Sequence, residues 1–431
     1  MWARKRLDIG WSDLAFGLLR ALRPADRWAA QRRVERACSG SRNALACLSV
    51  RSGFDLLLGA LALPPGSEVL VSAVTIPHMV EIIEHHGLVP IPVDLDANRL
   101  APRPDRMRRA VTPRTRAVLV AHLFGSRIPL EPVLALAEAH GLLVIEDCAQ
   151  AFAGTEYRGH PRADVSLFSF GPIKKATALG GAVLFVRDAR LFQQMRIRQA
   201  SYPVQSKGAY VRRLAKYGAL MACSSPVAFG VLMGALRAVG RDPDRAINGS
   251  VRGFRTGKLL ERIRRRPSAP LLAVLQRRLR TFDGRRLEDQ RAKGELLARL
   301  LRREVACPAA TVVPHTHWVF PIVVDRPPQV VAGLRRAGFD ATQGASLSVV
   351  APPADRPWLE PAAARDVLAR VVFLPLYPEM PTRAIRHMAQ VVLTECGGVA
   401  SKQGAPTPHF LGNVDACSFR EREAACTGRI P

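Results

Sequence analysis

The stretch from Leu142 to Phe185 constrains the fold of this chain more than any other. It begins with four consecutive apolar residues, Leu142 to Ile145, and such an uninterrupted run is typical of a strand buried on both faces of a parallel sheet. Two acids, Glu146 and Asp147, follow the run directly. Because ligands of α/β folds bind outside the carboxyl ends of parallel strands, we expect these acids at the edge of a ligand site.

Two further apolar runs in this stretch, 165–170 and 182–186, predict neighbouring strands. Two lysines, Lys174 and Lys175, stand between them. A carboxylate at one strand end and a lysine just past the next suit pyridoxal phosphate. This cofactor bonds covalently to a lysine and needs a carboxylate to keep its pyridine nitrogen protonated.

Three short motifs follow one another here. They read Glu146-Asp147-Cys148-Ala149-Gln150, then Ser169-Phe170-Gly171-Pro172-Ile173-Lys174, then Gly180-Gly181-Ala182. They resemble the E-D-x-A-Q/H, S-F-x-P-x-K and Gly-Gly motifs of the DegT/DnrJ/EryC1/StrS family, the pyridoxal-phosphate-dependent sugar aminotransferases of fold type I. The resemblance extends from about Ser49 to Val392, with an interruption after Arg190.

The resemblance implies an α/β fold with a three-layer α/β/α large domain, a mostly parallel sheet and a small α+β C-terminal domain. The alternation of strand and helix patterns after residue 49 independently favours a mostly parallel sheet. We expect an N-terminal helical arm over 1–45, a cofactor-binding large domain over 46–194, a basic and apolar helical insertion over 195–260, an interface helix and small domain over 261–396, and a disordered tail over 397–431.

The resemblance also implies the residues of the active site. Lys174 is expected to bond to the cofactor and to move the proton, and Asp147 to keep the ring nitrogen protonated. The remaining contacts are expected from Gln150 at the phenolic oxygen, Ile76 over the ring in place of the usual aromatic residue, and Arg51, Ser52, Ser169 and the partner subunit's Arg264 at the phosphate. A helix N-terminus with a hydroxyl and a guanidinium favours such a dianion.

Simpler interpretations exist for individual residues. Lys175 is a rival to Lys174, although the spacing from Pro172 favours Lys174. Taken alone, Asp147 fits a buried acid in a polar network, and Arg264 fits a solvated position on a basic helix. Their joint placement in the family pattern favours the cofactor roles.

Composition limits the classes of partner. The chain has 431 residues and a net charge of +27, which fits either an arginine-rich solvated surface or an anionic partner such as a nucleotide-linked sugar, a membrane or a nucleic acid. No zinc-finger or aromatic-basic signature is present, so we expect no nucleic acid. The eight cysteines form no C-x-x-C pair, which argues against a metal site and favours a reducing cytoplasm.

The insertion contains a segment without charged residues, Tyr217 to Leu236. Its length permits a transmembrane helix, but Ser224-Ser225-Pro226 interrupts it. We expect two short helices, either buried or at an oligomer contact. Contact with a membrane surface is the alternative.

The implied function is amino transfer from an amino acid, with glutamate as the expected donor, to a keto group of a nucleotide-linked sugar. The implied assembly is a homodimer with a shared active site. Three alternatives stay open: a dehydratase of the same fold, although such relatives replace the lysine with histidine, a non-catalytic cofactor-binding regulator, and a basic protein that binds membranes or nucleic acid.

Overall fold

The computed structural model describes residues 1–38, 40, 42–154, 157–238, 259–344 and 346–397. A seven-stranded sheet lies at its centre, with the strand order β1-β8-β7-β6-β5-β2-β4. Its strands are β1 (Asn43–Cys47), β2 (Glu68–Ser72), β4 (Val89–Val93), β5 (Thr115–Ala121), β6 (Leu143–Asp147), β7 (Val165–Ser169) and β8 (Ala182–Val186). All pairs are parallel except those that β8 forms with β1 and β7. The predicted mostly parallel sheet is confirmed.

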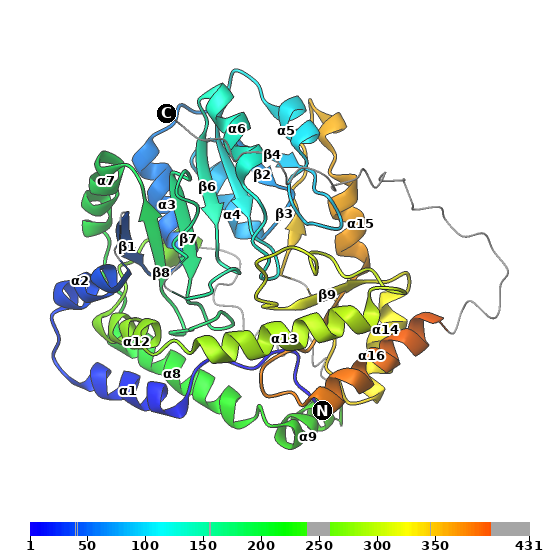
Figure 1. Ribbon diagram of the computed structural model, residues 1–431. Coiled ribbons are helices and arrows are strands. Elements are labelled where there is room, and N and C mark those ends of the chain that lie inside the picture. The colour runs from blue at the N-terminus through cyan, green and yellow to red at the C-terminus, as the bar shows by residue number, and fades with distance from the viewer. Residues whose placement is uncertain (39, 41, 155–156, 239–258, 345, 398–431) are drawn as a thin grey trace, which may run out of the picture. The chain divides into compact units, whose positions relative to one another are not determined.

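Helices cover both faces of the sheet (Figure 1). One face packs against α3 (Val50–Leu61), α4 (Pro77–His85) and α7 (Ala189–Ala200). The other packs against α5 (Pro104–Ala110) and α6 (Glu131–His140), and further along against α2 (Arg27–Cys38) and α12 (Ala269–Arg280). Side chains alternate between the faces, so in β6 Ile145 enters the first core and Val144 the second.

The C-terminal part forms a smaller α+β layer with its own core. Strands β9 (Phe320–Val323) and β11 (Val371–Leu374) pair antiparallel, and β10 (Ser348–Val349) pairs with β3 (Val74–Thr75). The helices of this part are α13 (Gly284–Leu301), α14 (Pro327–Arg336), α15 (Ala362–Arg370), α16 (Thr382–Gly397) and a short 3-10 helix, Pro357–Leu359. Helix α13 crosses below the strand ends of the main sheet (Figure 1).

The predicted N-terminal helical arm is helical only in part. Its first ten residues are extended, and α1 (Trp11–Leu22) and α2 follow. Trp2 exchanges backbone hydrogen bonds with Gly338 and Asp340, so the arm is tied to the C-terminal part. Residues 43–45, which the sequence analysis placed in the helical arm, belong instead to the edge strand β1.

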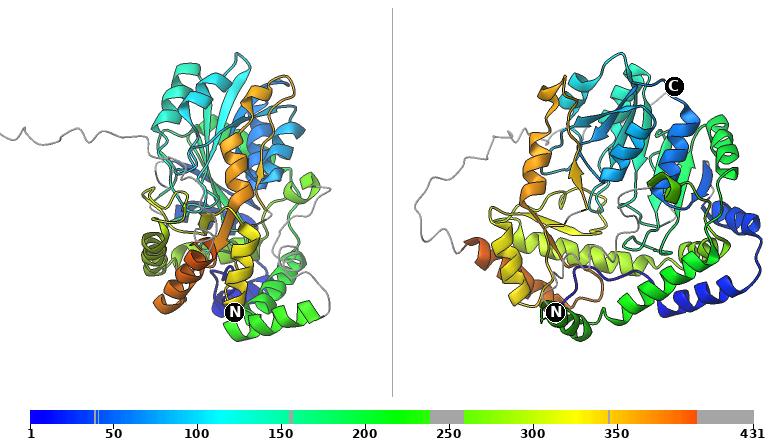
Figure 2. Two further views of the ribbon diagram at one scale, coloured as in Figure 1. Left: turned by 90° about the vertical axis from the view of Figure 1, so that its right-hand side faces the viewer. Right: turned by 180° about the vertical axis from the view of Figure 1, so that it is seen from behind.

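The insertion contains α8 (Lys207–Ala222), α9 (Pro226–Ala238) and the short α11 (Leu259–Ile263). Helix α8 packs beside α1, as both views in Figure 2 show. Helices α8 and α9 separate at Cys223–Ser225, as the sequence predicts. No single described helix is long and apolar enough to cross a membrane, but Lys207–Ala222 and Pro226–Leu236, bent by 100°, pass that test as a pair. Residues 239–258 and the predicted tail from residue 398 lie outside the described residues.

Gly125 brings two distant segments together. It has a φ of +102°, and a Cβ atom there would lie 2.6 Å from the backbone nitrogen of Trp318. Thr316 N donates to the Gly125 carbonyl over 2.8 Å. The turn after β5 therefore positions residues 316–318 only if this residue is glycine.

We expect Gly125→Ala to destabilise the protein more than Gly66→Ala. Gly66 has a φ of +80°, but no atom lies within 4 Å of the place that a Cβ atom would take, so its substitution costs only the left-handed backbone, about 1–2 kcal/mol. Gly125→Ala adds a backbone clash to the same cost. Urea unfolding of both variants measures the difference, and equal losses would contradict the close approach.

Candidate active site

The site forms where β6 and β7 end. Asp147 is the last residue of β6, on the same side of the strand as Ile145 and α3. Its Oδ1 accepts a hydrogen bond from Ala149 N over 2.9 Å. Burial raises the pKa of Asp147, and the charges of Lys174 and Arg51 oppose that shift. An acid, a lysine and an arginine from three different elements thus converge, as predicted.

Lys174 lies in the turn after β7. Its backbone nitrogen donates to Gly171 O over 3.0 Å, and its Nζ lies 4.0 Å from the centroid of the Trp318 ring. Burial lowers the pKa of Lys174 to about 8; Asp147 opposes this shift and Arg51 adds to it. A larger fraction of this amine is therefore uncharged near neutral pH than in an exposed lysine.

Lys175 points elsewhere. Its Nζ donates to Oε1 of Gln290 on α13 over 2.5 Å. Burial lowers its pKa to about 8 as well, and the nearby charges that modify this shift belong to Asp8, Arg286 and Glu379. The structure therefore separates the two lysines: Asp147 acts on the pKa of Lys174 alone.

The start of α3 carries the groups that were predicted to bind the phosphate. Ser49 caps the helix, because its Oγ accepts from Ser52 N over 3.1 Å, and the two hydroxyls lie 3.0 Å apart. Burial lowers the pKa of Arg51 to about 10, against the opposing charge of Asp147. The N–H groups at a helix start, a buried hydroxyl and a guanidinium are suited to a phosphate dianion.

Three further residues are predicted to contact the cofactor. Gln150 Oε1 accepts from Phe124 N over 2.8 Å, which fixes the side chain and leaves its amide NH2 as a donor. Ile76 is partly buried against the core below α3. Ser169 ends β7, and its Oγ accepts from Gly171 N over 3.4 Å.

Arg264 is held within its own subunit. It donates from Nε and Nη2 to the two oxygens of Asp55 on α3, over 3.0 and 2.9 Å. His86 and Tyr202 also contact this carboxylate. Burial by itself would raise the pKa of Asp55, but hydrogen bonds from His86 and Arg264 outweigh it and lower the pKa to about 2. The role of Arg264 at a partner's phosphate stays a prediction.

Glu146, the neighbour of Asp147, lies on the opposite side of β6. Its carboxylate accepts from His122 Nε2 at 2.8 Å, Ser166 Oγ at 2.7 Å, His160 N at 2.8 Å and the Tyr157 hydroxyl. Burial by itself would raise the pKa of Glu146, but these hydrogen bonds outweigh it and lower the pKa to about 2. His122, Glu146 and Cys148 are close enough to share a metal ion, but hydrogen bonds already satisfy the carboxylate, which explains this cluster without a metal.

Trp318 is a site residue that the sequence reasoning missed. Its ring lies beside Lys174, and its Nε1 donates to Ile173 O over 2.8 Å. The ammonium of Lys5, from the N-terminal arm, lies 4.6 Å from the same ring centroid. Trp318 lies just before β9 (Phe320–Val323), on a segment that no motif marked.

The residues present fit pyridoxal phosphate. The donor groups at the start of α3 suit the phosphate, Asp147 supplies the buried charge for a ring nitrogen, and Lys174 supplies an amine with a lowered pKa. Pyridoxal phosphate requires these three chemistries.

The comparisons with known proteins agree with this geometry. The model of the DegT/DnrJ/EryC1/StrS aminotransferase family matches residues 31–239. Among solved structures, Helicobacter pylori PseC, an aminotransferase of pseudoaminic acid biosynthesis, has 14% identity and a TM-score of 0.67, covering 92% of this chain and 99% of its own. NtdA from Bacillus subtilis with bound PMP has 17% identity and a TM-score of 0.64, with coverages of 90% and 83%.

A third solved structure is DesI in the presence of its TDP-sugar product. It has 20% identity and a TM-score of 0.62, covering 92% of this chain and 93% of its own. At these identities the structural likenesses establish the fold, and the predicted fold type I architecture is confirmed.

We expect Lys174, and not Lys175, to carry the cofactor. Borohydride reduction of the cofactor-loaded protein and peptide mapping should find the phosphopyridoxyl group on Lys174. Lys175→Ala should leave that modification in place, and Lys174→Ala should abolish it, because only Lys174 lies near Asp147. A modified Lys175 would refute the assignment.

We expect the amine of Lys174 in the cofactor-free protein to become reactive with a midpoint near pH 8, since only the uncharged amine is nucleophilic. Exposed lysines should show midpoints near about 10.4. In Asp147→Asn the midpoint should move lower still, because the carboxylate stabilises the ammonium. Competitive labelling with acetic anhydride, read by mass spectrometry of the Lys174 peptide, measures both. An unchanged midpoint in Asp147→Asn would show that the two groups do not interact.

Proposed function

This chain belongs to the DegT/DnrJ/EryC1/StrS aminotransferase family and is therefore a pyridoxal-phosphate-dependent aminotransferase; we propose that it moves an amino group from glutamate to the keto group of a nucleotide-linked sugar. The observation that carries the proposal is the convergence of Lys174 with Asp147 at the ends of β7 and β6. The relatives of known structure add support, since DesI was solved in the presence of its TDP-sugar product.

Each residue has a distinct chemical task. The bound cofactor supplies an electron sink for the carbon atom that loses its proton. The Nζ of Lys174, with its lowered pKa, accepts and returns that proton as a general base and acid. Asp147 would favour a proton on the ring nitrogen through its negative charge. Arg51, Ser52 and the start of α3 would hold the phosphate.

Amino transfer to a panel of nucleotide-linked keto sugars tests the proposal. Purified, cofactor-loaded protein is incubated with glutamate and each sugar, and both 2-oxoglutarate and the amino sugar are quantified. Wild type should form the two products in equal amounts with at least one sugar, and Lys174→Ala should form none. A cofactor-loaded protein that aminates no sugar would favour the regulator alternative.

We expect Asp147→Asn to retain cofactor but to lose at least about tenfold in turnover, because an amide cannot supply the charge that favours the protonated ring nitrogen. Cofactor absorbance and initial rates on the same sample separate binding from catalysis. A variant with undiminished turnover would refute the role of Asp147.

We also propose that the chain acts in the cytoplasm as a homodimer. The six described cysteines are free thiols, which suits a reducing compartment. The predicted contribution of Arg264 to the partner's site requires an assembled pair of subunits. Analytical ultracentrifugation of the active, cofactor-loaded protein tests this, and a fully active monomer would contradict it.

We propose further that α9 contacts the membrane surface. Val227 and Val231 are 78% and 68% exposed on it, and no acidic residue occurs from Lys207 to Ala238. Exposed apolar side chains on a segment without acidic residues suit an anionic bilayer.

Co-sedimentation with vesicles that contain phosphatidylserine tests the membrane contact. Val227→Glu combined with Val231→Glu should weaken binding several-fold, while Ile197→Glu, at a site 73% exposed on α7, should not. Equal binding to vesicles without anionic lipid, or an effect of Ile197→Glu as large as that of the α9 variant, would contradict the proposal.

A further inference from the structure

Helix α1 (Trp11–Leu22) is apolar on its outer face as well as on the face that it buries. Leu14 and Gly17 are buried, and a Cβ atom at Gly17 would lie 3.0 Å from side-chain atoms of Leu214 on α8 and Val274 on α12. A helix at the surface of a soluble protein usually has polar residues on its outer face. Four large apolar side chains of α1 are exposed instead: Trp11 (58%), Leu18 (41%), Leu19 (55%) and Leu22 (82%).

These four residues lie on one side of the helix. An α-helix has about 3.6 residues per turn, so residues seven or four positions apart, such as Trp11, Leu18 and Leu22, lie nearly in line. Leu19 lies beside this line, and the exposed Ala15 lies within it. Together these five residues form an apolar row along α1, the outer strip.

Exposed apolar side chains are concentrated on α1 and α9. Of the eleven large apolar side chains that are exposed among the described residues, four belong to α1 and two, Val227 and Val231, belong to α9. Both helices lie along the lower edge of the fold in Figure 1 and in both views of Figure 2. Single exposed apolar residues are common, whereas a group of them marks a surface that binds a partner or a membrane.

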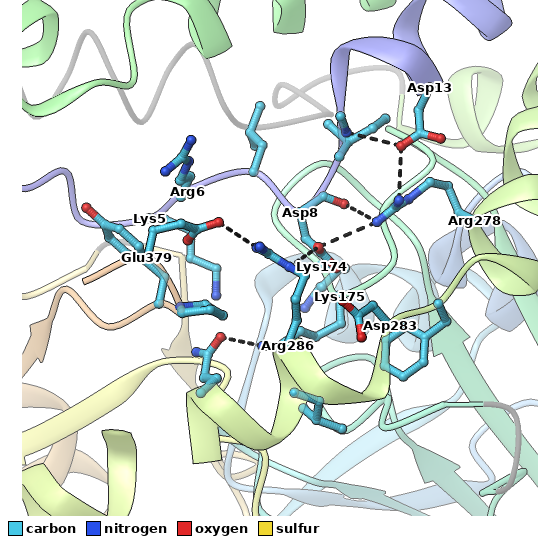
Figure 3. Close-up of a pocket in the computed structure, with 18 of the residues that line it drawn as sticks. Lys5, Arg6, Asp8, Asp13, Lys174, Lys175, Arg278, Asp283, Arg286 and Glu379 are labelled. Carbon is cyan, nitrogen blue, oxygen red and sulfur yellow. Dashed lines mark hydrogen bonds and ion pairs between the residues drawn. The ribbon is translucent and has the colours of Figure 1, made fainter. Parts of the chain in front are cut away.

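The only acid of these helices is turned inward. Asp13 is the single acidic residue in the sequences of α1, α8 and α9. It is buried, and it accepts hydrogen bonds from Arg277 at 2.8 Å and, as Figure 3 shows, from Arg278 at 3.0 Å. No exposed carboxylate of the three helices therefore opposes an anionic surface.

Helix α8 adds positive charge beside the outer strip. Lys207 Nζ, at the start of α8, donates to the carbonyl of Arg23, just after α1, over 3.2 Å. A Cβ atom at Gly218 would lie 3.7 Å from the ring of Trp11, so the two helices lie side by side and antiparallel. Arg23 and, on α8, Arg212 are exposed. An apolar strip with basic groups beside it matches the acyl chains and phosphates of an anionic membrane surface.

We infer that α1 binds the surface of an anionic lipid bilayer, with the outer strip at the boundary between headgroups and acyl chains and with Arg23 and Arg212 at the lipid phosphates. This contact goes beyond the one proposed for α9, because it places a second helix with other residues on the membrane. Tryptophan is favoured at such boundaries. The family model matches residues 31–239, so α1 precedes the matched part and the match does not account for the outer strip.

Co-sedimentation of the cofactor-loaded protein with phosphatidylcholine vesicles, with and without phosphatidylserine, tests the inference. Leu19→Glu combined with Leu22→Glu should lower partition onto the anionic vesicles at least about tenfold, because two leucines that enter the bilayer are replaced by anions. Ile197→Glu combined with Trp358→Glu is the matched control. It adds the same charge at two exposed apolar positions on other elements and should bind nearly as well as wild type. Retained cofactor absorbance shows that each variant is folded.

The fluorescence of Trp11 measures insertion directly. Brominated phosphatidylcholine in the anionic vesicles should quench the fluorescence of the wild-type protein, since bromine quenches only tryptophans that reach the acyl chains. Trp11→Phe should remove most of this quenching, and Trp358→Phe should leave it unchanged. Quenching that persists in Trp11→Phe would overturn the inference.

The contacts of α1 and α9 are distinguishable. If the Leu19 and Leu22 variant binds like wild type while Val227→Glu with Val231→Glu abolishes binding, the inference fails and the contact of α9 stands. If only the α1 variant loses binding, the contact of α9 fails and the inference stands. Equal binding of the wild-type protein to vesicles without phosphatidylserine would overturn the inference. A changed oligomeric state without lipid, together with unchanged vesicle binding, would instead assign the outer strip to a second copy of the chain.

Discussion

Two adjacent carboxylates on β6 determine how the neighbouring strands are joined and where the candidate site lies. Because side chains alternate along a strand, Glu146 and Asp147 lie on opposite sides of the sheet. Glu146 has four hydrogen-bond donors, which overcome burial and keep its pKa low. Asp147 has one backbone donor, and burial raises its pKa. The first carboxylate fastens β5, β6 and β7 to one another, and the second keeps a buried charge available for chemistry.

The cationic side chains around the site form two groups with different roles. Arg278 and Arg286 are paired with acids and connect the arm to α12 and α13. Lys5, Lys174 and Lys175 have lowered pKa values, chiefly because they are buried. Burying an unpaired ammonium costs stability, so a cluster of three is better understood as an arrangement for binding and proton transfer than as a contribution to folding.

The sequence predicted the central sheet, and it predicted that Asp147 and Lys174 would lie near each other. An apolar run that ends in an acid, such as 142–147, has few structural alternatives, and the position of Lys174 follows from the turn after the next strand. The contact of Lys5 with Trp318 could not be predicted, because it joins distant segments and depends on the left-handed turns at Gly125 and His317. Strand β1 (Asn43–Cys47) is too short for periodicity to distinguish a strand from the end of the predicted helical arm.

The family resemblance assigns Arg264 to the partner's phosphate, but the contacts of Arg264 in this structure lie within its own subunit. The partner of this arginine is a carboxylate that is almost completely buried, with a side-chain exposure of 1%, whereas the arginine itself is 34% exposed. Removing the arginine would leave a buried charge with only His86 and Tyr202 as donors, a strongly destabilising change. A loss of assembly in an Arg264 variant could therefore arise from Asp55 and α3 rather than from a missing contact across subunits. Replacing Asp55 with asparagine in the same variant removes the stranded charge, so only an effect that persists in the double variant belongs to the partner's site.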